Sequence, residues 1–144
     1  MHIYATIDTN VLVSALYKAD SNPARILLLI QEKKITPLLH PKIISEYIEV
    51  LSRKKFNFNA HIVAEVIKII IESGEMIDSL SSDIRDIVSD PDDAIFYNIT
   101  MTAKQTVSED TFLVTGNIKH FPIKPFVVTP ARLLEILNTP AERL

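Results

Sequence analysis

The chain has 144 residues, is 47% hydrophobic, carries a formal net charge of −3 and contains no cysteine. This length and apolar content fit one domain over residues 1–144, and the lack of cysteine excludes disulfides and thiolate metal sites. No apolar run is long enough to span a bilayer and there is no basic leader, so we expect a cytoplasmic protein. Gly74 and Gly116 are the two glycines, which excludes the common glycine-rich phosphate-binding loops.

The first half of the chain alternates short β-branched apolar runs with amphipathic segments. This pattern predicts, in chain order, a strand at 3–8, helices at 11–16 and 24–31, a strand at 35–39, and helices at 41–52 and 60–73. Ser21 and Pro23 stand at the N-cap and first-turn positions expected before the helix at 24–31. Gly74 lies where a C′ glycine would end the helix at 60–73.

The second half of the chain repeats the alternation after a polar stretch. It predicts a strand at 75–78, a loop at 79–90, a helix at 92–104, strands at 111–115 and 126–129, and a helix from Pro130 to about 137. Proline and acids in Asp-Pro-Asp-Asp at 90–93 mark the start of the helix at 92–104. Alternating strands and helices predict an α/β fold: a three-layer α/β/α sandwich around a mainly parallel sheet.

Several polar residues fall at predicted strand ends or first helical turns. Asp8 ends the first strand, and the carboxyl edge of a parallel sheet is where ligands bind. Glu46, the acids at 90–93 and Thr115-Gly116-Asn117 are expected near the same edge. Converging carboxylates repel one another, and a hard divalent ion such as Mg²⁺ or Mn²⁺ relieves that repulsion. Such an ion activates water and neutralises charge on a phosphodiester, which predicts metal-dependent phosphoryl hydrolysis.

Four motifs occur in the order and approximate spacing found in PIN-domain nucleases. They are Ile-Asp-Thr-Asn-Val-Leu-Val at 7–13, Ser-Glu-Tyr at 45–47, Asp-Pro-Asp-Asp at 90–93 and Val-Thr-Gly-Asn at 114–117. The resemblance covers nearly the whole chain and points to bacterial PIN proteins of toxin–antitoxin systems, relatives of the VapC type. It implies a Mg²⁺- or Mn²⁺-dependent endoribonuclease that cleaves RNA, forms a homodimer and is bound by an antitoxin protein.

The same resemblance implies a role for each motif residue. Asp8 matches the first metal ligand, Glu46 the second acid and Asp93 the third acid. Asp90 matches an accessory acid of the metal site. The supporting residues are Asn10, Thr115 and Asn117.

Asn117 departs from the pattern of many relatives, which have a fourth acid at this position. The departure leaves a site with one less negative charge, so metal stoichiometry and catalytic strength stay open. A neutral amide can still orient water.

Each site residue also has a simpler structural interpretation. Asp8 is a favoured capping residue for the helix that follows it. Glu49 would replace Glu46 as the inward acid if their helix were rotated. Asp92 is expected only to favour its helix dipole. A lone histidine such as His120 is more often structural or exposed than in contact with substrate.

Two surface segments have alternative interpretations as well. Arg53-Lys54-Lys55 precedes Phe56-Asn57-Phe58, a combination that suits single-stranded nucleic acid and equally a charged helix end. The isoleucine-rich segment 62–71 is mostly core, and it is wide enough to offer part of its face to a second copy or an antitoxin.

Two other classes of function are compatible with aspartate at a strand end. A haloacid-dehalogenase-type phosphatase needs a second aspartate two residues after the first, where this chain has Asn10, and a receiver domain needs adjacent acids at the first strand. The remaining alternative is a catalytically weakened PIN-fold module that binds RNA or a partner protein.

Overall fold

The computed structural model describes residues 2–81, 84 and 86–138. Its strands are β1 (Ile3–Ile7), β2 (Ile35–Leu39), β3 (Glu75–Met76), β4 (Thr111–Val114) and β5 (Val127–Val128). Its helices are α1 (Thr9–Tyr17), α2 (Asn22–Gln31), α3 (Pro41–Leu51), α4 (Ala60–Ser73), α5 (Pro91–Thr106), the short 3₁₀ helix η1 (Ile118–His120) and α6 (Pro130–Asn138).

The strands form one parallel sheet in the order β3-β2-β1-β4-β5. Strand β1 lies at the centre, with β2 on one side and β4 on the other. Ile7 is in register with Val114, and the Asp8 amide extends this pairing by donating to the Val114 carbonyl at 2.9 Å. The residue after β1 is therefore fixed at the carboxyl edge of the sheet, where ligand sites of parallel sheets occur.

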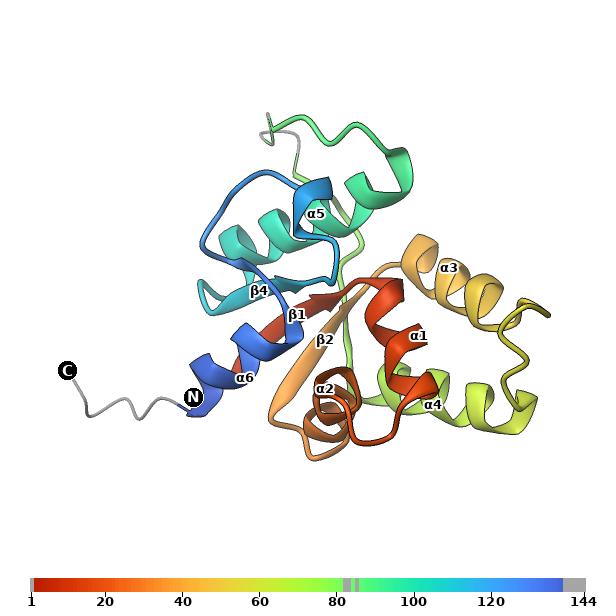
Figure 1. The fold of residues 1–144 in the computed structure, drawn as a ribbon. Helices are drawn as coiled ribbons and strands as arrows, with labels where there is room; N and C mark the ends of the chain where they lie inside the picture. The colour runs from red at the N-terminus through yellow and green to blue at the C-terminus, as the bar shows by residue number, and fades with distance from the viewer. Residues whose placement is uncertain (1, 82–83, 85, 139–144) are drawn as a thin grey trace.

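Helices cover both faces of the sheet, which confirms the predicted α/β/α architecture (Figure 1). Helix α5 packs against β1, β2 and β4 on one face. Helices α2 and α4 pack against β2 on the other face, with α1 and α6 beside α2. Helix α3 contacts α1, α4 and α5, so it lies at the edge where the two helical layers meet.

The centre of the sheet is apolar, with one hydrogen-bonded polar pair. Ile3, Ala5 and Ile7 of β1 are buried, as the continuous apolar run predicts for a strand covered on both faces. Thr6 is also buried, and the Thr100 hydroxyl from α5 lies 2.8 Å from its hydroxyl oxygen. This contact joins α5 to the central strand two residues before Asp8.

Several elements differ from the prediction in their bounds, and one was not predicted. Helix α1 begins at Thr9 rather than at 11, because Asp8 already occupies the N-cap position. The third strand covers Glu75–Met76, half of the predicted range 75–78. Helix η1 was not predicted, because three residues carry too little periodicity to indicate a helix. Residues 82–83 and 85 of the predicted loop at 79–90 lie outside the described residues.

Gly74 ends α4 for a different reason than a C′ glycine ordinarily does. Such a glycine usually adopts the left-handed conformation, but Gly74 has φ −91°. A Cβ atom there would lie 2.4 Å from Leu39 Cδ1 and 2.8 Å from the Ile70 carbonyl oxygen. The position therefore requires glycine because α4 closely approaches β2.

The outer face of α4 is partly apolar. Val63, Ile67 and Ile70 are buried, whereas Ile62 and Ile71 are exposed, so the isoleucine-rich segment is divided between core and surface rather than mostly core. Across the described ranges, no helix is long and apolar enough to cross a membrane.

Candidate active site

Asp8 lies at the carboxyl end of β1 and is only 5% exposed. Its carboxylate oxygen Oδ2 accepts a 2.6 Å hydrogen bond from the Thr115 hydroxyl, which follows β4. The Thr115 hydroxyl in turn accepts a 2.9 Å hydrogen bond from the backbone N–H of Asn117. Adjacent strand ends thus hold the Asp8 carboxylate in one orientation.

The structure argues against capping as the main role of Asp8. Although Asp8 occupies the N-cap position of α1, its side chain makes no capping hydrogen bond. Burial raises the pKa of Asp8, and the Thr115 hydrogen bond, the nearby Thr9 and Asn10 amides and the His120 charge oppose the rise. A buried carboxylate that is costly to ionise and bonds away from its own helix is more typical of a functional site than of a cap.

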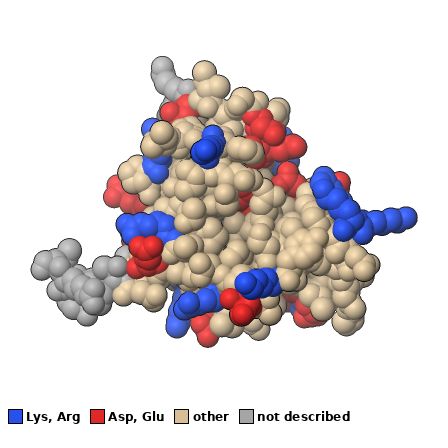
Figure 2. Space-filling view, in the orientation of Figure 1, with Lys and Arg blue, Asp and Glu red and all other residues tan. Residues whose placement is uncertain are grey.

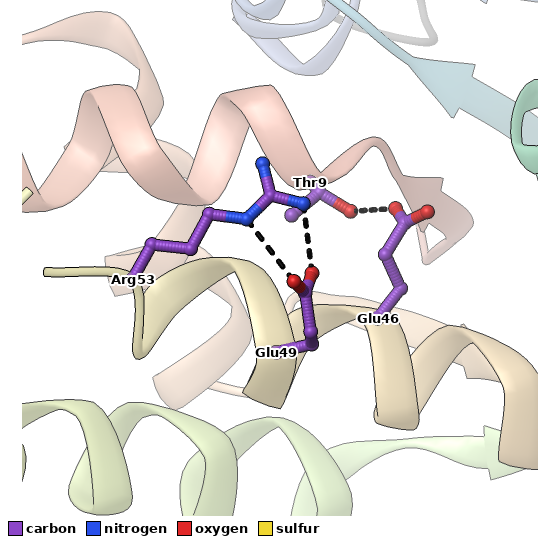
Figure 3. Close-up of polar contacts among 4 residues, drawn as sticks. All are labelled: Thr9, Glu46, Glu49 and Arg53. Atoms are coloured by element: carbon purple, nitrogen blue, oxygen red, sulfur yellow. Dashed lines mark hydrogen bonds and ion pairs between the residues drawn. The ribbon is translucent and has the colours of Figure 1, made fainter. Parts of the chain in front are cut away.

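Glu46 points from α3 towards Thr9 at the start of α1, as Figure 3 shows. Its carboxylate accepts a hydrogen bond from the Thr9 hydroxyl, one residue after Asp8. Glu49, three residues further along α3, pairs instead with Arg53 Nη2 at 2.9 Å (Figure 3). Of the two glutamates, Glu46 is therefore the one that contacts the turn after Asp8.

Tyr47 connects α3 to the end of β1. It is 1% exposed, and its hydroxyl donates to the Ile7 carbonyl. Burial, together with the charges of Asp8 and Glu46, raises the pKa of Tyr47 well above its ordinary value, so the hydroxyl stays a donor. Ser-Glu-Tyr thus supplies an acid to the crevice and, in the next residue, a fixed attachment to the strand that carries Asp8.

The start of α5 contributes the third acid. Asp93 is half-buried, and His120 Nδ1 from η1 lies 3.3 Å from its Oδ2. Burial raises the pKa of Asp93, as do the charges of Asp8 and Asp90, whereas His120 lowers it. Asp90 is exposed and caps α5 by accepting the Asp92 amide at 2.9 Å, so the predicted accessory acid already has a structural role.

The predicted supporting residues lie at the rim of this site. Asn10 is exposed at the start of α1, and Asn117 is half-buried just before η1. Together with Gly116 and Pro130 they line a cleft of about 480 Å³, within the size range of ligand pockets. The acids Asp8, Glu46 and Asp93 are not among the residues that line this cleft.

The acids of the site lie close enough for the charge of one to change the pKa of another. Glu46 has its pKa raised first by burial and then, after an opposing Thr9 hydrogen bond, by the charges of Asp92, Asp8 and Asp93. Among the described residues, no three acidic or histidine side chains form a ready-made metal cage. Mg²⁺, however, is commonly held by one or two carboxylates and several waters. An oxygen donor set whose members repel one another fits such an ion.

The all-parallel sheet, with carboxylates at its carboxyl edge, defines an α/β domain whose candidate site lies where ligands of such sheets bind. A family model of the PIN domain matches residues 4–119, so the chain belongs to the PIN domain family. Members of this family are nucleases that generally use divalent metals.

The chain is also similar in structure to VapBC2 from Rickettsia felis, solved bound to a DNA fragment from its promoter. The TM-score is 0.47 at 22% identity, over 81% of this chain and 90% of that one. No curated protein sequence matches the chain.

Sequence reasoning underestimated two features of the site. The Thr9 hydroxyl binds Glu46, a contact that was not predicted. His120 is 57% exposed, as expected of a lone histidine, and its pairing with Asp93 was not predicted. The signal for both was adjacency: Thr9 follows Asp8, and His120 follows Asn117 by three residues.

Proposed function

We propose that this protein is a Mg²⁺- or Mn²⁺-dependent endoribonuclease. The observation that carries the proposal is the set of carboxylates Asp8, Glu46 and Asp93, which are held by separate elements. Burial raises the pKa of all three, and the charges of neighbouring acids raise it further for Glu46 and Asp93. Membership of a nuclease family and the four ordered motifs support it.

In this proposal Asp8 and Asp93 hold the ion, and Glu46 and Asp90 complete its surroundings. A bound ion would supply a water of lowered pKa and would neutralise charge on the phosphodiester. The chain's own contribution is positioning, because Thr115 orients Asp8. Asn117 lies at the rim of the cleft and orients water through its neutral amide.

The substrate class and the partners follow from the motif resemblance. In this proposal the RNA binds at the carboxyl edge of the sheet, where Asp8 lies. A toxin of this type acts as a homodimer in the cytoplasm and is neutralised by an antitoxin protein. The whole chain acts as one domain.

The decisive experiment compares two glutamates on one helix. Glu46→Gln is expected to reduce Mn²⁺-dependent cleavage of single-stranded RNA by about 100-fold or more, the range that positioned acid–base groups contribute. Glu49→Gln is the matched control and should cleave like wild type, because Glu49 is exposed and pairs with Arg53 rather than with a residue next to Asp8. Equal activity of Glu46→Gln and wild type, or wild-type cleavage no faster than that of Asp8→Ala, contradicts the proposal.

A second candidate function rests on Asn117, which gives the site one charge less than a four-acid site. In this alternative the protein is a catalytically weakened module that binds RNA or a partner protein. Calorimetric titration with Mn²⁺ separates the two: no heat of binding together with no cleavage supports the module, whereas binding abolished by Asp8→Asn supports the nuclease.

A further inference from the structure

Three aromatic side chains gather at the end of α1 and in the segment after α3. The Phe56 and Phe58 rings are stacked, with centroids 5.5 Å apart and planes at 13°. Tyr17 meets both edge-on, at 5.2 Å from Phe58 and 5.9 Å from Phe56. Tyr17 is nevertheless 61% exposed, so most of its ring faces solvent.

Exposed cations surround this aromatic group. Lys18 follows Tyr17, and Lys54 and Lys55 precede Phe56. Lys55 Nζ lies 5.1 Å from the Phe56 ring centroid, a cation–π distance. In Figure 2, Lys and Arg side chains stand out at the right of the molecule, over the segment that follows α3 in Figure 1. Arg53 is already paired with Glu49, which leaves the lysines as the available charges.

The aromatic group is connected to the candidate active site through two helices. Thr9 at the start of α1 binds Glu46, and Tyr17 ends the same helix about 12 Å away at the usual helical rise. Helix α3 carries Glu46 and leads towards Phe56. The two helices contact each other, so the group and the acids lie on neighbouring parts of one surface.

Charge separates these two parts. The acids Asp8, Glu46 and Asp93 are negatively charged, so they do not attract the phosphates of an RNA strand. At that site only the proposed divalent ion attracts the strand. Affinity for phosphates must therefore come from cations outside the crevice. Lys18, Lys54 and Lys55 supply such cations beside rings on which bases stack.

We propose that Tyr17, Phe56, Phe58, Lys54 and Lys55, with Lys18 beside them, form a basic–aromatic platform that binds the single-stranded RNA substrate. The proposal deepens the proposed function and rests on it. An unpaired base stacks on the exposed face of Tyr17, and the lysines contact the adjoining phosphates. The mutual stacking of the two phenylalanines makes the floor of the platform rigid.

The exposure of the platform argues for a single strand. Packing of the turn after α3 explains why the two phenylalanines are half-buried, but it does not explain why Tyr17 is exposed. Among the described residues, the three neighbouring lysines form no salt bridge. The bases of a duplex are already stacked on one another and offer no free face, whereas single strands present theirs. The platform therefore predicts a preference for single-stranded over duplex RNA.

The test measures binding without chemistry, by fluorescence anisotropy of a short fluorescein-labelled single-stranded RNA in EDTA. Tyr17→Leu should weaken binding about tenfold, the loss expected for one stacked base, and Tyr17→Trp should restore it. Lys54→Ala/Lys55→Ala should reduce the slope of log affinity against log salt by about 1.4, at about 0.7 per phosphate contact.

The matched control is Lys33→Ala/Lys34→Ala. These adjacent exposed lysines precede β2 at the opposite edge of the sheet, so this variant should retain the wild-type slope. Thermal unfolding checks that Tyr17→Leu is folded. If Tyr17→Leu is unfolded, Lys54→Ala/Lys55→Ala still tests the platform, because both lysines are exposed and their replacement does not disturb the core.

The result separates the platform from the nuclease proposal. Unchanged affinity and salt slope in both platform variants overturn the platform, even where wild type cleaves RNA and Glu46→Gln does not. The surface then serves a protein partner or only the fold. Loss of binding in both variants supports the platform even where wild type cleaves nothing. With Mn²⁺ and an active wild type, the platform variants should raise KM and leave kcat unchanged.

Discussion

Replacing Asp8 with asparagine is expected to stabilise the metal-free protein. The change keeps the shape of the side chain and removes one charge that is 5% exposed. An asparagine oxygen can still accept the Thr115 hydroxyl, so the contact between the ends of β1 and β4 is retained. The repulsion between this position and the acids Glu46 and Asp93 disappears.

The magnitude follows from two opposing effects. Effective burial of an ion costs several kcal/mol, and hydrogen bonds to a charged group return about 1.5–3 kcal/mol. The raised pKa of Asp8 shows that burial outweighs the hydrogen bonds. We therefore expect Asp8→Asn to add about 0.5–2 kcal/mol to the free energy of unfolding, the usual range for one stabilising substitution.

The sign of the pH dependence provides a further check. Because the pKa of Asp8 is raised in the folded protein above its ordinary 3.8, the folded state binds this proton more tightly than the unfolded chain. The stabilisation that protonated Asp8 gives the folded protein is complete below the unfolded-state pKa and is lost as pH rises through the folded-state pKa. The advantage of Asp8→Asn should therefore be full at neutral pH and vanish in acid.

Urea denaturation in EDTA measures this effect as a higher midpoint with an unchanged m-value. Asp20→Asn removes an exposed charge and should leave the midpoint near that of wild type. Adding Mn²⁺ should stabilise wild type by mass action and leave Asp8→Asn unaffected. A midpoint for Asp8→Asn at or below that of wild type in EDTA at neutral pH would refute the reasoning.

Further predictions concern the two glycines and the partner of Asp8. Gly74→Ala should destabilise the protein by about 1–3 kcal/mol in urea, because the new methyl group overlaps Leu39. Gly116→Ala is its control and should be neutral or stabilising by up to about 1 kcal/mol, because nothing lies within 4 Å of the added carbon; equal losses at both positions would be inconsistent with the close approach. Thr115→Val should cost about 1–3 kcal/mol by leaving the Asp8 carboxylate without its buried donor, and Thr115→Ser should recover most of that loss. Equal stability of the valine and serine variants would show that the hydroxyl contributes nothing.

Element types were predictable where local chemistry decides them. Ser21 accepts the Ala24 amide as the N-cap of α2, and Pro91 begins α5, as the short polar signals indicated. The parallel sheet also followed from the alternation of strands and helices. The strand order could not be predicted in this way. It depends on α5 packing across β1 and β2 so that β4 pairs with β1, and no local sequence pattern indicates this.

The acids of the site were predictable as a set, but their attachments were not. Asp8, Glu46 and Asp93 were selected by strand ends, helix faces and motif order. The contacts from Thr9 to Glu46 and from Tyr47 to the end of β1 join distant segments, so they become visible only when α3 is placed beside α1. Asp90 was predicted only as an accessory acid, so the bond of its side chain to the Asp92 backbone amide was not predicted.

The bond between Thr115 and Asp8 joins residues 107 positions apart. During synthesis, β1, α3 and the start of α5 therefore emerge from the ribosome well before the strand that orients the first carboxylate. A nascent chain ending before β4 carries Asp8, Glu46 and Asp93 but cannot hold them in their final geometry. The candidate site is thus completed only late in translation, after β4 has been made.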